Sequence, residues 1–461
     1  MKQILVIIIF LIASSSLGIA QHLSVSEQYA QYDADRLPAT FHKSRRDSVL
    51  KYMAKNGVAL FVGAAEKNRA NDVNYEFHQD PNFYYLTGHI QPNAALLLIN
   101  GKNPRQILFV DKKVPAQETW TGVRLGVDGA KELLGFTEAY VIDSLPSMLS
   151  SVLQKTDTFY YTLTYPNIKS PILDSTMKMA VDLYDLAKKK YSNVVFQPLS
   201  DVLSRLRCHK TREELDLLRK AVLTSNSAHN QILRDVRAGW YEYEIQALGE
   251  YIFKKNGCEY TGYPCIVGSG NNSTILHYET NRRQTKDGDF IEMDIAGEYH
   301  GYSADITRSY PVNGTFTPEQ RAIYDIVLEA QDSGIAAARA GNLFKAPHNA
   351  ALSVIRKGLM KLGIIKDPTE SFKYFMHGTS HYLGLDVHDA GAYGNLEPNE
   401  VITVEPGIYI KEGSPCDPKW WKIGCRIEDD ILITNGDPIN LSESSPRKAE
   451  DIEAMMKKGK Q

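Results

Sequence analysis

The sequence predicts two domains of different class: an α/β domain in the N-terminal part and an α+β domain in the C-terminal part. Three observations lead to this prediction. The chain has 461 residues, enough for two or three domains. Short apolar runs alternate with mixed segments up to about residue 165. From about residue 210, amphipathic helices and strand-like runs that suit antiparallel hairpins replace this alternation.

The composition is ordinary for a globular protein. With 43% hydrophobic and 23% charged residues, it excludes a disordered chain, a collagen-like chain and a multi-span membrane protein. A net charge of −3, from 52 basic and 55 acidic side chains, gives no electrostatic case for nucleic-acid binding. Five cysteines are too few for a scaffold built on disulfide bonds.

The first twenty residues predict a secretory signal peptide. Lys2 precedes an apolar run, Ile4 to Ile12, and small residues follow up to Ala20. The run is shorter than the roughly 20 residues that span a bilayer. We therefore expect cleavage near Ala20 and an exported protein, periplasmic or secreted, without stable membrane insertion. A buried N-terminal strand or an uncleaved anchor is the alternative.

Export would allow disulfide bonds to persist. Cys416 and Cys425 flank one short loop, and Cys258 and Cys265 flank another short segment. We predict a bridge within each pair, with Cys208 left over. Buried free thiols are the alternative. No CxxC spacing is present, so a structural zinc cluster is not expected.

In the N-terminal domain, the apolar runs at 58–62, 95–99 and 107–110 predict buried strands, and residues 47–55 predict a helix. Residues 166–205 are assigned to a connector. The predicted organisation is a signal peptide at 1–20, an N-terminal domain with its connector at 21–205, and a second domain at 206–461.

In the second domain, Arg212 to Val236 has helical spacing of apolar residues. Thr317 followed by Pro318 predicts a helix start, and that helix is expected to run to Gly341. The predicted strands lie near 290–295, 303–310, 401–410 and 426–433, and a final helix covers 450–458.

Two aspartates lie in a predicted hairpin within residues 289–310. Gly297 and Gly301 suggest a four-residue turn at 298–301, which would place Asp294 directly opposite Asp305, with Cβ atoms about 5 Å apart. Carboxylates that face each other repel unless a proton or a cation lies between them. A solvated polar face is the alternative.

More candidate ligands follow in the sequence. HGTSHYLGLDVHD, at 377–389, contains His377, His381 and His388. Glu405 is the single charge in VITVEPGIYI, and Glu428 lies in RIEDDILI. Buried carboxylates are rare unless they are paired or bind metal. One of them would fit a structural ion pair, but four with a histidine cluster favour a metal site.

This donor set indicates its own chemistry. Oxygen-rich ligation with one or two imidazoles suits Mn²⁺ or a similar hard cation, and four carboxylates balance two divalent ions. Two ions about 3.5–4 Å apart activate a shared water and polarise a carbonyl. The residues thus predict hydrolysis of an amide or a phosphate ester. Phosphate-binding glycine loops and the GxSxG motif are absent from the sequence.

The order Asp, Asp, His, Glu, Glu resembles that of the pita-bread metallopeptidases, which include methionine aminopeptidase, prolidase and aminopeptidase P. The resemblance implies the pita-bread (creatinase/aminopeptidase) fold for residues 206–461. It implies that Asp294 binds one metal, that His381 and Glu405 bind the other, and that Asp305 and Glu428 bridge the two. It also implies a hydroxide between two divalent ions, most simply Mn²⁺ with Zn²⁺ or Co²⁺ as alternatives, and a proton shuttle by Glu405.

The resemblance extends to five positions outside the ligand set. His277 and His388 resemble substrate-side histidines, and His388 would contact the scissile carbonyl or the proline. His377 would support the site, Arg426 would orient the second bridging carboxylate, and Tyr409 would bind substrate. A structural hydrogen bond is the alternative for each histidine.

Within the family, aminopeptidase P is favoured. FHQDPNFYYLTGHIQPNAALLLI, at 77–99, resembles its N-terminal domain, and Ser380 precedes the ligand histidine where prolidases usually have Gly. His78 is a departure, because the motif commonly has Arg there, and the contact made by that Arg is left open. Residues 117–126 resemble a stretch that in some members reaches the active site of a neighbouring subunit. Trp120 is therefore expected either at such an interface, in a homo-oligomer, or buried locally.

The expected function is that of an exported Xaa-Pro aminopeptidase acting on peptides with proline at the second position. Three alternatives remain open: a prolidase restricted to Xaa-Pro dipeptides, a metal-free creatinase-like hydrolase, and a non-catalytic binding module.

Overall fold

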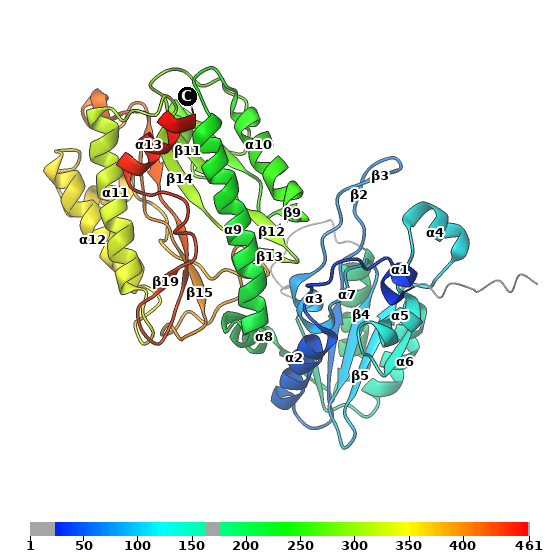
Figure 1. Cartoon of the computed structure of the whole chain (residues 1–461). Helices are drawn as coiled ribbons and strands as arrows, with labels where there is room; N and C mark the ends of the chain where they lie inside the picture. Colours follow the sequence, from blue (N-terminus) through cyan, green and yellow to red (C-terminus); the bar gives the residue numbers. More distant parts are fainter. Residues whose placement is uncertain (1–23, 163–174, 460–461) are drawn as a thin grey trace, which may run out of the picture.

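The computed structural model describes residues 24–162 and 175–459 of the chain (Figure 1). The predicted signal peptide and part of the predicted connector, 163–174, lie outside these residues. Among the helices of the described residues, none is long and apolar enough to cross a membrane.

The N-terminal domain is built on a six-stranded mixed sheet in the order β6-β5-β4-β1-β7-β8. Its central strands are apolar at almost every position because helices cover both faces. Leu97 packs against α6 (Leu145–Leu153) and α7 (Ser175–Lys190) on one face, whereas Leu96 and Leu98 pack toward α2 (Ala39–Tyr52) and α3 (Pro81–Thr87) on the other. The strands are β1 (Gly57–Val62), β4 (Ala95–Ile99), β5 (Arg105–Val110), β6 (Glu138–Val141), β7 (Thr158–Tyr161) and β8 (Val195–Pro198), with a small hairpin of β2 (Asn68–Ala70) and β3 (Val73–Asn74) beside them.

This sheet confirms the three predicted strands and adds β6, β7 and β8, which the sequence analysis missed. Strand β8 lies in the predicted connector and pairs in parallel with β7 at the sheet edge. Its side chains are mostly exposed, so it lacks the apolar signal of a buried strand. The helices of this domain are α1 (Val25–Tyr29), α2 (Ala39–Tyr52), α3 (Pro81–Thr87), α4 (Pro115–Thr121), α5 (Gly126–Glu132), α6 (Leu145–Leu153), α7 (Ser175–Lys190) and α8 (Ser200–Cys208).

The second domain is α+β, as predicted, with small antiparallel sheets lying between two groups of helices (Figure 1). Helices α9 and α10 lie on one side, and α11 and α12 lie on the other. The helices are α9 (Arg212–Asp235), α10 (Glu242–Lys255), α11 (Pro318–Ala337), α12 (Ala346–Lys361) and α13 (Ala449–Gly459). The strands are β9 (Tyr260–Thr261), β10 (Ile266–Ser269), β11 (Phe290–Asp294), β12 (Gly297–Tyr299), β13 (Tyr302–Ser303), β14 (Thr307–Pro311), β15 (Val401–Val404), β16 (Gly407–Ile410), β17 (Ile423–Arg426), β18 (Asp429–Leu432) and β19 (Ile439–Asn440).

The predicted helix starts are confirmed in this domain. Thr317 caps α11 by accepting the N–H of Gln320, and Pro318 occupies the first helical position. The helix ends at Ala337, four residues before the predicted stop. Thr211 caps α9 in the same way, in a capping box with Glu214.

The predicted four-residue turn in the aspartate hairpin is wrong. The turn has two residues, His300 and Gly301, with φ of 49° and 86°. Positive φ at both central positions is the geometry of a type I′ turn, which matches the twist of the flanking strands. The register therefore places Asp294 opposite Thr307, and Asp305 occupies a diagonal position two residues away.

Each of the two predicted C-terminal strand runs is broken at its carboxylate. The first run divides into β15 and β16 around Glu405 and Pro406, and the second divides into β17 and β18 around Ile427 and Glu428. Pro406 has no N–H to donate to a ladder, which favours the break. The carboxylates therefore leave the regular sheet at the point where the two halves meet.

The two predicted disulfide bonds are wrong: all five cysteines, each within the described residues, are free thiols. Cys425 lies in β17 opposite Ile408, buried in the core beside Ser309, whereas Cys416 lies in a partly exposed loop. The Cys258 sulfur lies against Gly297 rather than against another thiol.

His78 makes the interdomain contact that the sequence analysis left open. Its Nε2 lies 2.9 Å from Glu298 Oε1 on β12, across the boundary between the domains. The hydrogen bond and the charge of Glu298 raise the pKa of His78. A folded-state pKa above the unfolded value means that the contact stabilises the protein fully below about pH 6.5 and is lost as pH rises through the folded value.

We expect His78→Arg to retain this contact with a permanent charge. Wild type should therefore lose stability relative to the variant between pH 6 and pH 9, by no more than about 1 kcal/mol because the His78 side chain is partly exposed and screened. Urea unfolding at both pH values measures the difference. Glu298→Gln should remove the pH-dependent difference, and parallel pH profiles of wild type and His78→Arg would contradict the assignment.

Candidate active site

Four carboxylates from separate strand ends meet in the second domain. Asp294 ends β11, Asp305 lies between β13 and β14, and Glu405 and Glu428 lie in the two strand breaks. Asp294, Asp305 and Glu428 are 7%, 5% and 2% exposed. The apolar residues that alternate with Asp294 point the other way, into the core. The fold thus turns acidic side chains toward one another inside the protein.

His381 joins this group. Its Nε2 lies 3.3 Å from Asp305 Oδ2 and 3.6 Å from Glu405 Oε1. Donor atoms of Asp305, His381 and Glu428 all lie within 4.8 Å of one another. The ring Nδ1 is 3.1 Å from the carbonyl of Tyr382, a partner to which it donates, so Nε2 is the nitrogen left to bind a metal. The structure therefore brings the predicted ligands together, while their roles as ligands remain predictions.

Keeping these carboxylates ionised costs free energy, because they are removed from water and repel one another. Burial, with the charges of Asp305 and Asp294 adding to it, raises the pKa of Glu405 to about 7. Burial and the charge of Asp305 raise the pKa of Glu428 well above its usual range, and burial also raises that of Asp294. An acidic, oxygen-rich donor set with one imidazole fits divalent cations, which would relieve this repulsion.

Arg426 is the guanidinium that contacts the site. Its Nη2 donates to Asp294 Oδ2 at 2.7 Å, its Nη1 donates to the Tyr409 hydroxyl at 2.8 Å, and its Nε donates to Thr307 Oγ1 at 3.1 Å. Thr307 in turn donates to Glu428 Oε2 at 2.6 Å. The expectation that Arg426 orients Glu428 is therefore corrected: Arg426 holds Asp294 directly and reaches Glu428 only through Thr307.

Tyr409 does not face substrate, contrary to the expectation from the resemblance. It is 3% exposed, and its hydroxyl lies between Arg426 and His377, whose Nε2 is 2.9 Å away. The strand β16 that carries it is buried on both faces. Tyr409 therefore contacts the solvent-facing side of the site only indirectly, by its hydrogen bond with His377.

The three predicted histidines lie on the open side. The Nδ1 of His377 is 3.5 Å from Glu405 Oε2, and the ring centre of His388 is 4.1 Å from that of His381. His277 is exposed, and it lies within electrostatic reach of both His377 and His388. Burial, followed by the charge of Arg426, lowers the pKa of His377 to about 3, so this histidine is neutral.

Several residues of the site were missed from the sequence. Tyr263 donates its hydroxyl hydrogen to Asp294, and Asp430 accepts the N–H of Asp305. Glu292 is fully buried with one oxygen 2.9 Å from Arg426 Nη1, and burial raises its pKa to about 8. Glu292 precedes Asp294 by two residues, so the alternation of the strand places both side chains on the same face and could have identified Glu292. Nothing in the sequence indicated Tyr263.

Trp120 lies far outside this group, on α4, which projects from the N-terminal domain (Figure 1). It is 89% exposed, the most exposed of the large apolar side chains in the described residues. The alternative of a locally buried tryptophan is therefore wrong for the single chain.

Comparison with known proteins gives consistent matches to both parts of the chain. Residues 216–435 match metallopeptidase family M24, and residues 42–160 match the N-terminal domain of aminopeptidase P. The chain is 36% identical to the Xaa-Pro aminopeptidase of Escherichia coli strain K12, over 89% of this chain and 96% of that protein. It is similar to the solved structure of E. coli aminopeptidase P with the inhibitor Pro-Leu, with a TM-score of 0.86, 35% identity, and coverage of 92% of this chain and 99% of that one. A Zn-substituted form of E. coli aminopeptidase P in complex with product gives the same TM-score and identity, covering 92% of this chain and 100% of that one.

We expect Thr307→Val to weaken metal binding. The change removes the hydroxyl that joins Arg426 to Glu428 while keeping the branched shape that suits β14. Loss of such an outer contact to a metal ligand lowers metal affinity by roughly 10- to 100-fold. Titration of the metal-depleted protein with Mn²⁺ measures the change, with exposed Thr315→Val as the control. Unchanged affinity in Thr307→Val would show that Glu428 does not need this contact.

Proposed function

Because this chain belongs to the aminopeptidase P group of metallopeptidase family M24, we propose that it hydrolyses the bond between an N-terminal residue and a following proline. One observation carries the proposal: the five predicted ligands, distant in sequence, are intact and lie together at the buried strand ends. A non-catalytic binding module would have no need of this costly arrangement.

The residues that would hold the metals are Asp294, Asp305, His381, Glu405 and Glu428. When bound, two divalent ions supply charge that lowers the pKa of water and polarises a carbonyl. We propose Mn²⁺ as the working metal because the donors are mainly carboxylate oxygens. Zn²⁺ and Co²⁺ are the alternatives, and one of the related structures is that of a Zn-substituted enzyme.

Glu405 is the group of the chain that we propose moves the proton. It lies in a strand break rather than within a ladder, and its Oε2 is 3.5 Å from His377 Nδ1. In this position it would take a proton from the attacking water and deliver it to the amine that leaves. The proline nitrogen needs that proton because it departs as a secondary amine.

The histidines on the open side would handle the substrate. His388 and His277 are exposed beside the acidic group, so we propose that His388 contacts the scissile carbonyl or the proline and that His277 lies along the substrate. Proline has no N–H and a fixed φ, so peptidases that require that N–H leave such bonds uncut. Selection of proline therefore needs shape and carbonyl contacts rather than a backbone acceptor.

A set of peptides tests the function. With Mn²⁺ present, Xaa-Pro-Xaa tripeptides should be cleaved after the first residue, as followed by mass spectrometry. Glu405→Gln should lower kcat by roughly 10²- to 10⁴-fold through loss of proton transfer, whereas the exposed control Glu443→Gln should not.

The alternatives predict different results in the same assay. Cleavage of Xaa-Pro dipeptides without turnover of tripeptides would identify a prolidase instead. Full activity after exhaustive chelation would favour the metal-free hydrolase. Absence of any turnover in the metal-loaded protein would favour the binding module.

We also propose that the working form is an exported homo-oligomer. Residues 1–20 have the pattern of a cleaved signal peptide, and the exposed Trp120 on α4 offers apolar surface to a second copy. The purified protein should start near residue 21 by intact mass and sediment as more than one chain, with Trp120→Ala shifting it toward the monomer. A purified protein that keeps residues 1–20 would contradict the proposed export. A wild-type protein that sediments as a monomer would contradict the proposed homo-oligomer.

A further inference from the structure

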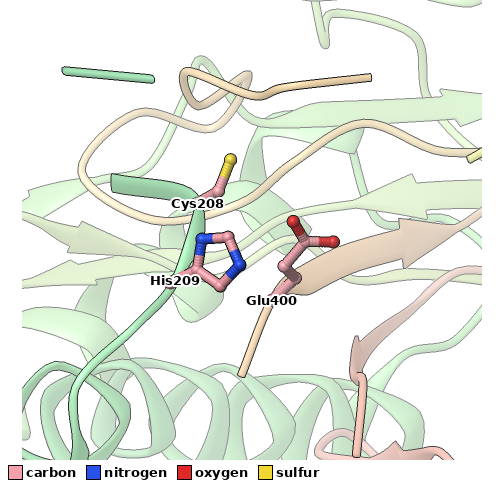
Figure 2. A group of neighbouring side chains, drawn as sticks. All are labelled: Cys208, His209 and Glu400. Atoms are coloured by element: carbon pink, nitrogen blue, oxygen red, sulfur yellow. The ribbon is translucent and has the colours of Figure 1, made fainter. Parts of the chain in front are cut away.

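We propose that Cys208, His209 and Glu400 form a second cation site, separate from the active site, that binds a Zn²⁺-like ion. Cys208 ends α8, His209 follows it, and Glu400 directly precedes β15 (Figure 2). One donor atom from each of the three lies within 4.8 Å of the others. None of these residues belongs to the active-site group, so the two sites can be tested independently.

The donor set has the chemistry of a borderline-soft cation. Zn²⁺ binds thiolate sulfur at about 2.3 Å and imidazole nitrogen or carboxylate oxygen at about 2.0–2.2 Å, so its donors lie within about 4.5 Å of one another. The spacing observed here requires only small side-chain movements to reach that geometry. A thiolate also separates this site from the active site, whose donors are carboxylates and one imidazole.

The orientation of His209 favours metal binding. Its Nδ1 is 3.1 Å from the carbonyl of Arg205 and donates a hydrogen bond to it. This leaves Nε2 as the ring nitrogen that can bind a metal ion. Nε2 lies 3.0 Å from Oε2 of Glu397, which places a carboxylate oxygen beside the ring nitrogen that would bind the ion. Glu397 is exposed and offers a fourth donor at the mouth of the site.

Cys208 and Glu400 provide the buried part of the site. Both are almost fully buried. Lys210, the neighbouring cation, is held by Asp389 at 2.9 Å. When a divalent ion binds, the thiol proton passes to solvent as the sulfur–metal bond forms.

A second observation points to the same place. Tyr382 is fully buried, and among the described residues its hydroxyl has only the backbone of Tyr393 beside it as a polar neighbour. It lies within electrostatic reach of Glu400 and Cys208. An ion or its bound water beside Cys208 would give this hydroxyl a further partner.

A third cluster of the same kind, Asp33, Glu259 and His300, lacks this need for a cation. Arg36 already pairs with Asp33 at 2.8 Å and with Glu259 at 3.0 Å. The negative charge of the Asp33 cluster is thus neutralised by Arg36. Among the ion pairs of the described residues, by contrast, none joins an arginine or lysine to Cys208, His209 or Glu400.

Titration of the metal-depleted full chain with Co²⁺ tests the proposal. Cobalt bound to a thiolate gives a charge-transfer absorption that the carboxylate and imidazole donors of the active site cannot give. We expect this band in wild type, with an amplitude that corresponds to one cobalt–thiolate site per chain. It should be absent in Cys208→Ser and retained in the matched control Cys416→Ser, whose thiol is partly exposed and belongs to none of the possible ligand clusters of the described residues.

A second variant keeps the test decisive if Cys208→Ser does not fold. His209→Gln changes a partly exposed ring, and it should lower the affinity for Zn²⁺ at the thiolate site by at least about tenfold while active-site variants such as Asp294→Ala keep the cobalt–thiolate band. Absence of the band in wild type would overturn the proposal. A band or Zn²⁺ affinity that is the same in wild type and His209→Gln would also overturn it.

Discussion

Mutual repulsion among buried carboxylates is the constraint on which the rest of the catalytic domain depends. Like charges at short range in a poorly solvated site interact strongly, and one guanidinium cannot balance four carboxylates. Arg426 is placed to serve several of them at once, contacting Asp294 directly and Glu428 through Thr307. The negative charge that Arg426 does not balance favours the binding of cations. The arrangement of the strands is in this way connected to metal binding.

The fold holds these carboxylates in place through hydrogen bonds to their backbone as well as to their side chains. The N–H of Glu405 donates to the carbonyl of Thr379 at 2.9 Å, and that of Glu428 donates to the carbonyl of Thr307 at 3.1 Å. On the far side, Arg308 donates to the Glu428 carbonyl at 2.7 Å while fully buried against Asp429. The break at Glu405 is thus anchored by the segment just before His381 and the break at Glu428 by β14, which preorganises the carboxylates without a regular ladder at those positions.

The sequence revealed much of the fold and of the candidate site because both leave local signals. Alternation around Asp294 and the isolated charge of Glu405 in an apolar run identified buried carboxylates, and Thr317 with Pro318 identified a helix start. Register was harder, because the two-residue turn at His300 requires a left-handed backbone in a residue other than glycine, which is uncommon. The contacts of Tyr263 and Thr307 depend on tertiary packing between distant strands, so local sequence could not predict them. The disulfide predictions failed for a related reason: closeness in sequence says nothing about the direction of each Cys side chain.

The turn at His300 and Gly301 links the hairpin that carries Asp294 and Asp305 to the other domain. The His300 ring contacts Glu259 Oε1 at 2.6 Å through Nδ1 and Asp35 Oδ1 at 3.0 Å through Nε2, and Asp35 comes from the N-terminal domain. The strands that bear Asp294 and Asp305 are therefore tied at their far end to a residue beyond the domain boundary. It follows that the two domains should melt in a single calorimetric transition, and that an isolated catalytic fragment would lose cooperativity at the hairpin that carries Asp294 and Asp305.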